Sequence, residues 1–147
     1  MKTLITKERR AASQLISVVG ASETEVMEIG WRYVFEERGC VYVWVGQGED
    51  KRLVQALDET PLQLAHAAKA GKRKYLVTCC PNLEEVHRAQ GRFAREMYRR
   101  FTEEDIRGLK MCRIGKNTHL DEELLEKVGA LMGNYCADWV EYLISCR

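Results

Sequence analysis

The residues with the clearest potential for chemistry are four arginines, Arg88, Arg92, Arg95 and Arg99, spaced three or four residues apart. On an α-helix, which turns about 100° per residue, this spacing places all four guanidinium groups in one narrow stripe. Each guanidinium is a planar fork of donors that matches the oxygens of a phosphate or carboxylate. The pattern therefore predicts a helix surface that binds anions.

The charge of this helix is expected to need a partner. Like charges at i,i+4 positions are destabilising by about 0.2–0.5 kcal/mol per pair, so a helix that needs only solubility usually interleaves acids with bases. This helix repeats one sign, which indicates that a partner supplies the negative charge. The alternatives are plain solvation and pairing inside the fold. The acids considered for such pairing are Asp121, Glu122, Glu123 and Glu126.

Neighbouring lysine and arginine residues extend the predicted site. The chain has 147 residues and a net charge of only +1, but residues 66–116 contain 13 basic and 6 acidic residues, a net charge of +7. The predicted nucleic-acid-binding residues are Arg88, Arg92, Arg95, Arg99, Arg100, Arg107, Lys110 and Arg113. The bases expected to widen this surface are Lys72, Arg73, Lys74 and Lys116. An RNA or DNA backbone is the expected partner, because backbone contacts need charge but no sequence readout.

We predict a non-enzymatic nucleic-acid-associated binding protein or a subunit of a nucleoprotein complex. No motif of a known RNA- or DNA-binding fold accompanies the stripe. The alternative is a protein-interaction module, an inhibitor or adaptor, that uses the same basic face against an acidic protein. A further alternative is a thiol- or metal-dependent enzyme.

Two adjacent cysteines, Cys79 and Cys80, precede the arginine helix. A helix N-terminus can lower the pKa of a thiol and create a nucleophile, but the redox motif has two residues between its cysteines. We interpret all six cysteines of the chain as free thiols. Cys79 and Cys80 are expected to be buried and inert at the end of a strand.

Other candidate groups lack the spacing that their chemistry requires. The residues nearest to a metal-ligand set are Cys79, Cys80, His87, Cys112 and His119. They lack the paired ligands, two to four residues apart in each half, of a zinc site. Residues 46–48 lack the Lys-Ser/Thr ending of a phosphate loop, and the acids at 49–50 lack a partner acid for nuclease chemistry. We predict no cofactor, no metal and no enzymatic activity.

Composition favours one domain. Hydrophobic residues make up 46% of the chain, enough for a single core without disulfide or metal support. We predict a mostly helical α+β domain over residues 1–147, with a sheet of about three strands and a long C-terminal helix. No apolar run fits a signal peptide or a membrane span, so we expect a cytoplasmic protein without a membrane partner. The sequence does not predict an oligomeric state.

The first half is expected to contain two helices and a hairpin. Thr6 is predicted to cap a helix over residues 7–19, which Gly20 ends, and Ser22 with Glu25 forms a capping box for the next helix. Residues 31–35 and 40–45 are rich in β-branched and aromatic types, and a short loop with a left-handed Gly39 suits a hairpin between them. The alternative continues the second helix to Arg38.

The second half is expected to be helical apart from one strand. We predict helices over 50–59 and 61–70, with Pro61 in the first turn, and a strand over 74–79 that forms a crossover unit with residues 40–45.

Three more helices complete the prediction. Asn82 and Glu85 cap the arginine helix to about residue 101, and a short helix follows to about 111. The last helix runs from about 118 to 145. Its apolar stripe, assigned to the core, comprises Leu124, Val128, Leu131, Tyr135 and Trp139.

Overall fold

The computed structural model describes residues 2–102 and 122–133. In these residues, helices precede and follow a small antiparallel sheet. The elements are α1 (Lys2–Val19), α2 (Glu23–Glu28), the 3-10 turn η1 (Trp31–Tyr33), β1 (Val34–Glu37), β2 (Cys40–Val45), the 3-10 turn η2 (Gly48–Asp50), β3 (Arg52–Gln55), α3 (Thr60–Ala70), α4 (Leu83–Thr102) and α6 (Glu122–Leu131). The three strands pair in the order β1-β2-β3. The α+β prediction is therefore confirmed.

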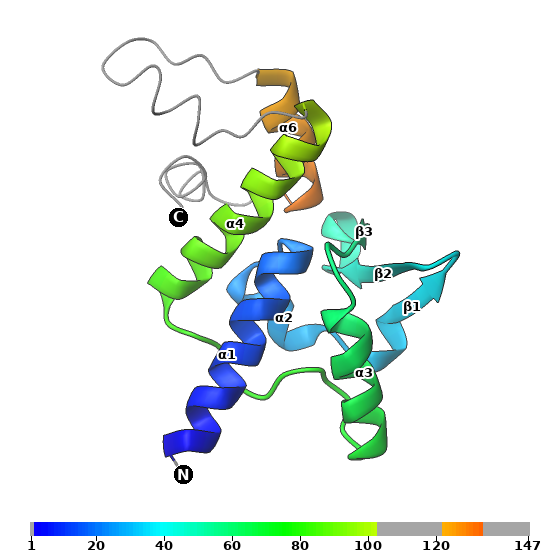
Figure 1. Cartoon of the computed structure of the whole chain (residues 1–147), viewed down its shortest axis with the longest axis vertical. Helices are drawn as coiled ribbons and strands as arrows, with labels where there is room; N and C mark the ends of the chain where they lie inside the picture. Colours follow the sequence, from blue (N-terminus) through cyan, green and yellow to red (C-terminus); the bar gives the residue numbers. More distant parts are fainter. Residues whose placement is uncertain (1, 103–121, 134–147) are drawn as a thin grey trace.

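Helix α1 crosses the middle of the molecule. It packs against α4 on one side and against α3 on the other, and α6 packs against α4 and β3 (Figure 1). Its predicted apolar face is confirmed, because Ala12, Leu15, Ile16 and Val19 are fully buried. The helix begins at Lys2, so Thr6 lies inside it and the prediction of an N-cap at this residue is wrong.

Gly20 ends α1 as predicted. Its φ is +70°, and its backbone N–H donates to the Ile16 carbonyl at 2.8 Å. A Cβ atom at this position would lie 2.5 Å from ring carbons of the buried Phe93 of α4. The glycine therefore serves both the left-handed turn and the close approach of α4 to α1.

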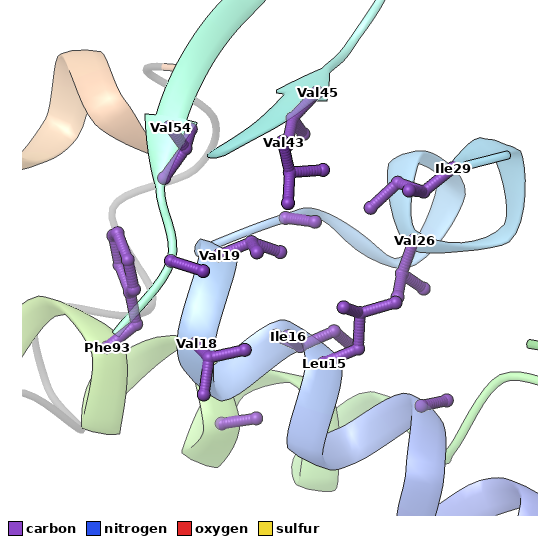
Figure 2. Packing of buried hydrophobic residues seen from close by; sticks show 14 of the residues in the cluster. Leu15, Ile16, Val18, Val19, Val26, Ile29, Val43, Val45, Val54 and Phe93 are labelled. Atoms are coloured by element: carbon purple, nitrogen blue, oxygen red, sulfur yellow. The ribbon is translucent and has the colours of Figure 1, made fainter. Parts of the chain in front are cut away.

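The inner face of the sheet supplies the rest of the core. Val43, Val45 and Val54 are buried and point toward the apolar side chains of α1 and α2, among them Val19 and Val26 (Figure 2). Complete burial of such a side chain contributes about 1.5–3 kcal/mol to folding. This layer of valines positions the sheet on the two helices.

The hairpin prediction is confirmed for β1 and β2, and the helical alternative to Arg38 is wrong. Glu37 pairs with Cys40, which leaves Arg38 and Gly39 as a two-residue loop. Both loop residues have positive φ, +53° and +78°, as a type I′ turn requires. Residues 31–33 form η1 instead of the start of a strand.

Two predicted elements in the next segment are wrong. Residues 50–59 contain β3 instead of a helix, and β3 pairs antiparallel with β2. Gly46 and Gly48 have φ of +85° and +60°, which reverses the chain within a few residues and brings β3 beside β2. Residues 74–79 form no strand, and Tyr75 makes only an isolated bridge with Gly30. The predicted crossover unit is therefore wrong. Closing the short loop between β2 and β3 costs less chain entropy than closing the long connection from residues 40–45 to 74–79 would.

Two of the helices predicted for the second half, 61–70 and the arginine helix, are confirmed as α3 and α4. Helix α3 carries Pro61 in its first turn, and the side chain of Asn82 accepts a hydrogen bond from Glu85 N–H at 2.9 Å at the start of α4. The unbroken helix to residue 145 is not confirmed, because α6 ends at Leu131 and Gly133 has a φ of +82°. The helix predicted over 102–111 and the stripe residues Tyr135 and Trp139 lie outside the described residues.

A buried ion pair joins three elements. Arg52 of β3 donates to both carboxylate oxygens of Glu25 in α2 at 2.8 and 2.9 Å, and the two side chains are 12% and 4% exposed. Its Nε also donates to the Leu131 carbonyl of α6 at 2.6 Å. Glu25 additionally completes the predicted capping box with Ser22. Removing one partner of such a buried pair is destabilising by about 3–5 kcal/mol, so this cluster holds α2, β3 and α6 together.

Candidate nucleic-acid interface

The arginine helix α4 is amphipathic. Val86 and Phe93 are buried and Met97 packs against the core, whereas Arg88, Arg92 and Arg99 are exposed. Arg95 is half-buried and Arg100 is exposed. The remaining predicted binding residues, Arg107, Lys110 and Arg113, lie outside the described residues, as does Lys116.

The expectation that this helix carries one sign of charge is wrong. Glu84 and Glu96 lie one turn before Arg88 and Arg100, and the arginine–carboxylate distances are 2.7 and 3.3 Å. Arg99 Nε also donates to Glu96 at 3.0 Å. Pairs of this kind in solvent are worth about 0.3–0.5 kcal/mol each, so a phosphate can replace the carboxylate.

The same contacts act on the titration of Glu96. The hydrogen bond from Arg99 holds the pKa of this carboxyl below its usual range, with partial burial acting in the opposite direction and Arg100 adding to the lowering. A guanidinium that binds a phosphate instead would release this constraint. An anion that binds to Arg99 or Arg100 would therefore change the protonation of Glu96.

A second basic surface lies between η1 and the end of α3, around a cavity of about 590 Å³. Among the residues that the structure describes, five of its lining side chains are cationic, two are aromatic and none is acidic. We call this set the Trp31 pocket; it comprises Gly30, Trp31, Arg32, Tyr33, Lys69, Lys72, Arg73 and Lys74. Positive charges gathered in a hollow make the electrostatic potential there more positive, which attracts anions and raises their local concentration.

Backbone pairing fixes the two walls of the Trp31 pocket. Trp31 N–H donates to the Lys74 carbonyl at 3.1 Å, and Leu76 N–H donates to the Ile29 carbonyl at 3.0 Å. Between them, a Cβ atom at Gly30 would lie 3.1 Å from the Lys74 carbonyl oxygen, so the glycine permits this close approach. The aromatic wall and the lysine-rich wall are thus joined by main-chain hydrogen bonds.

The turn after α3 sets the direction of the cationic wall. Arg73 N–H donates to the Ala68 carbonyl at 2.8 Å, the long-range bond of a Schellman C-cap. The left-handed residue of this cap is Lys72, with a φ of +56°, whereas Gly71 has a φ of −82°. The prediction that α3 ends at Gly71 is confirmed, but the strained conformation falls on a lysine that lines the pocket.

Cations of the Trp31 pocket contact aromatic rings. The guanidinium of Arg32 and the ammonium of Lys69 lie 5.2 and 5.1 Å from the ring centre of Trp31. Lys74 lies 5.3 Å from the ring centre of Tyr75, which is 41% exposed. Among the described residues, none of the five pocket cations is ion-paired with a carboxylate, in contrast to Arg88, Arg99 and Arg100 of α4.

Basic side chains of α1 lie between the Trp31 pocket and α4. Lys7 lines a smaller cavity, of about 240 Å³, together with Arg73, and one acid, Glu8, lines it as well. The exposed Arg10 follows one turn later, and after another turn Ser13 accepts a hydrogen bond from Arg92 of α4 at 3.4 Å. Residues three apart share one side of a helix, so this edge of α1 connects the two basic surfaces.

Sequence reasoning identified only part of the pocket. It named Lys72, Arg73 and Lys74 as bases that widen the site, but missed Trp31, Arg32 and Tyr33 of η1 and Lys69 of α3. The available signal was the grouping of aromatic with basic residues, Trp-Arg-Tyr at 31–33 and Lys-Arg-Lys-Tyr at 72–75. Their proximity could not be read from local patterns, because it depends on pairing between Gly30 and Tyr75.

The thiol of Cys80 has a raised pKa, the opposite of the shift that activates a nucleophile. Cys40, Cys79 and Cys80 form no disulfide, but Cys79 and Cys80 are half-buried instead of buried, and they follow an irregular segment instead of a strand. Burial raises the pKa of the Cys80 thiol, and Glu23 and Cys79 raise it further. A raised pKa reduces the thiolate population on which nucleophilic chemistry depends.

Neither a metal site, a membrane-spanning helix nor a similar known protein indicates the function of the described residues. Within residues 2–102 and 122–133, no group of three or more His, Cys, Asp or Glu side chains is placed to hold a metal ion, and no helix has the length and hydropathy to cross a membrane. Comparison with protein-family models, curated proteins and solved structures gives no match. The two basic surfaces are therefore the basis for inferring a function.

Proposed function

We propose that the protein binds the phosphate backbone of a nucleic acid, without catalysing a reaction on it. The observation that carries this proposal is the Trp31 pocket, where five cations and, within residues 2–102 and 122–133, no acid line one cavity. Bringing like charges together is unfavourable unless an anion neutralises them, and each phosphate of a nucleic acid supplies one negative charge.

The size of the cavity favours a flexible chain of phosphates. Its volume of about 590 Å³ lies in the range that holds a nucleotide-sized group. An extended backbone can enter this hollow and continue along the basic edge of α1 toward α4. A folded acidic protein presents its carboxylates on a convex surface, which contacts the rim but fills the hollow poorly.

The arginines of α4 act as secondary contacts in this proposal. Arg88, Arg99 and Arg100 must exchange a carboxylate within their own helix for a phosphate, so each gains less than an unpaired cation gains. They position the backbone without reading its sequence.

A salt titration with two probes tests this function. We expect a fluorescently labelled oligonucleotide to bind with a log–log salt slope of about −0.7 to −0.9 per neutralised phosphate. Poly-glutamate of matched charge, which stands in for an acidic protein partner, is expected to bind more weakly. Absence of oligonucleotide binding at low salt, or equal affinity for poly-glutamate, would contradict the proposal.

A further inference from the structure

We infer that Trp31 is a stacking platform for an unpaired base, so that the Trp31 pocket selects single-stranded over double-stranded nucleic acid; this inference rests on the proposed function. The indole belongs to η1 and is half-buried, with its inner edge packed against the core. A second cavity, of about 460 Å³, shares Trp31, Arg32 and Lys69 with the pocket. The indole therefore borders two hollows and is held in a fixed position between them.

The charges around the ring match the two parts of a nucleotide. A base is a flat aromatic surface, and base–aromatic stacking adds to backbone electrostatics in proteins that bind single strands. Arg32 and Lys69 already lie over the indole, about 5 Å from its centre. When a base occupies one face of the ring, these flexible cations remain within reach of the flanking phosphates.

Duplexes and simple polyanions cannot use both features. In a duplex the bases are stacked on each other and paired, so their flat faces are not available to a side chain. Polyphosphate offers the charge of a nucleic acid backbone but no ring. Selectivity for an unpaired strand is thus expected to come from Trp31, and general affinity for anions from the cations.

A second tryptophan provides an internal control. Trp44 of β2 is 37% exposed and has Lys51 at 5.1 Å from its ring centre, so it resembles Trp31 in its cation contact. Its hollow, of about 170 Å³, also contains Glu25 and Glu28. Glu25 is already paired with Arg52, but the carboxylate of Glu28 repels a phosphate, so Trp44 is not expected to hold a nucleotide.

The test measures binding of three probes to Trp31→Leu, Trp31→Phe and Trp44→Leu. The probes are a single strand of about 12 nucleotides, in RNA and DNA forms, a duplex of the same length and inorganic polyphosphate. We expect Trp31→Leu to weaken single-strand binding by about 5- to 150-fold, the range for loss of one stacked base. Polyphosphate binding should not change, Trp31→Phe should retain most of the affinity, and Trp44→Leu should resemble the parent protein.

The outcomes separate this inference from the proposed function. If Trp31→Leu binds single strands like the parent, or weakens all three probes equally, the stacking role is overturned and phosphate binding remains. Equal losses in Trp31→Leu and Trp31→Phe would also overturn it, because the second variant keeps an aromatic face. If the parent protein binds none of the probes at low salt, both the stacking role and the proposed function are wrong.

Discussion

The Trp31 pocket and the arginine helix α4 are both basic, but they manage their charge in different ways. On α4, Glu84 and Glu96 lie within one turn of the arginines and pair with three of them. In the Trp31 pocket none of the described lining residues is an acid, and aromatic rings lie beside the cations in place of carboxylates. A count of basic residues therefore does not rank the two surfaces, because the neighbouring acids decide how much charge is available to a ligand.

The largest expected effect concerns the contact that holds α4, and with it one of the two basic surfaces, against α1. Gly20→Ala places a Cβ against the buried Phe93 at the contact between α1 and α4 and forces a left-handed alanine. We expect a loss of about 2–5 kcal/mol in the free energy of unfolding, from the backbone conformation and overpacking together. Chemical denaturation measures this loss.

Gly39→Ala is the matched control for this substitution. Gly39 also has a positive φ, but a Cβ added at this position would have no atom within 4 Å. We expect a loss of only about 1–2 kcal/mol, the backbone part alone. Equal losses in the two variants would show that Phe93 does not constrain position 20.

A direct comparison of the surfaces uses two triple variants with the same change in charge. Lys72→Gln, Arg73→Gln and Lys74→Gln in one protein should weaken oligonucleotide binding by about 100-fold at low salt and reduce the salt slope by about 2–3. Arg88→Gln, Arg92→Gln and Arg99→Gln should have a clearly smaller effect, because two of these arginines already pair with glutamates. A larger loss in the α4 variant would reverse the ranking of the two surfaces.

Lys72→Gly separates backbone strain from charge in the Trp31 pocket. Glycine tolerates the φ of +56° at this position, so the protein should become more stable by about 1 kcal/mol while it loses affinity for the oligonucleotide. Lys72→Gln is the control, since it loses the charge and keeps the strained conformation. Thermal unfolding and binding of both variants check the prediction, and an equal stability of the two would show that the conformation at this position is not strained.

The smallest effect concerns the glutamate between two arginines. Glu96→Gln should raise oligonucleotide affinity by about two- to fourfold if Arg99 and Arg100 contact phosphate. Because the folded-state pKa of Glu96 is lowered, its ion pairs stabilise the protein above the unfolded-state pKa, and this contribution is lost as the pH falls through the folded-state value. Stability measured across the acid range should show a smaller decline in Glu96→Gln. Unchanged affinity would remove this end of α4 from the interface.

Features of the fold that depend on neighbouring residues were predictable from the sequence. The capping box of Ser22 and Glu25, the cap at Asn82 and the turn at Gly39 are each determined within about four residues, and the structure contains all three. The same local logic predicted that the arginines share one face of α4. It overlooked Glu84 and Glu96. The rule that like charges three or four residues apart destabilise a helix also means that acids at this spacing pair with the arginines.

Features that depend on distant pairing were not predictable in this way. The segment that contains β3 has no strong period, and it becomes a strand because two left-handed glycines turn it back onto β2. The Trp31 pocket brings η1 to the turn after α3 through two main-chain hydrogen bonds between residues 29–31 and 74–76. Neither the aromatic residues nor the lysines indicate this pairing on their own, so only three of the eight described lining residues were identified.

The contacts of Arg52 have a consequence for the order of folding. Arg52 contacts Glu25 and Leu131, which lie 27 and 79 positions away from it along the chain, whereas short loops join the strands of the sheet. Closing long loops costs more entropy, so we expect the sheet to form before Arg52 reaches Glu25 and Leu131. Interactions that are absent from the transition state slow unfolding and leave the folding rate nearly unchanged. Arg52 should therefore determine how long the native state persists, and stopped-flow kinetics of Arg52→Met should show faster unfolding with unaltered refolding.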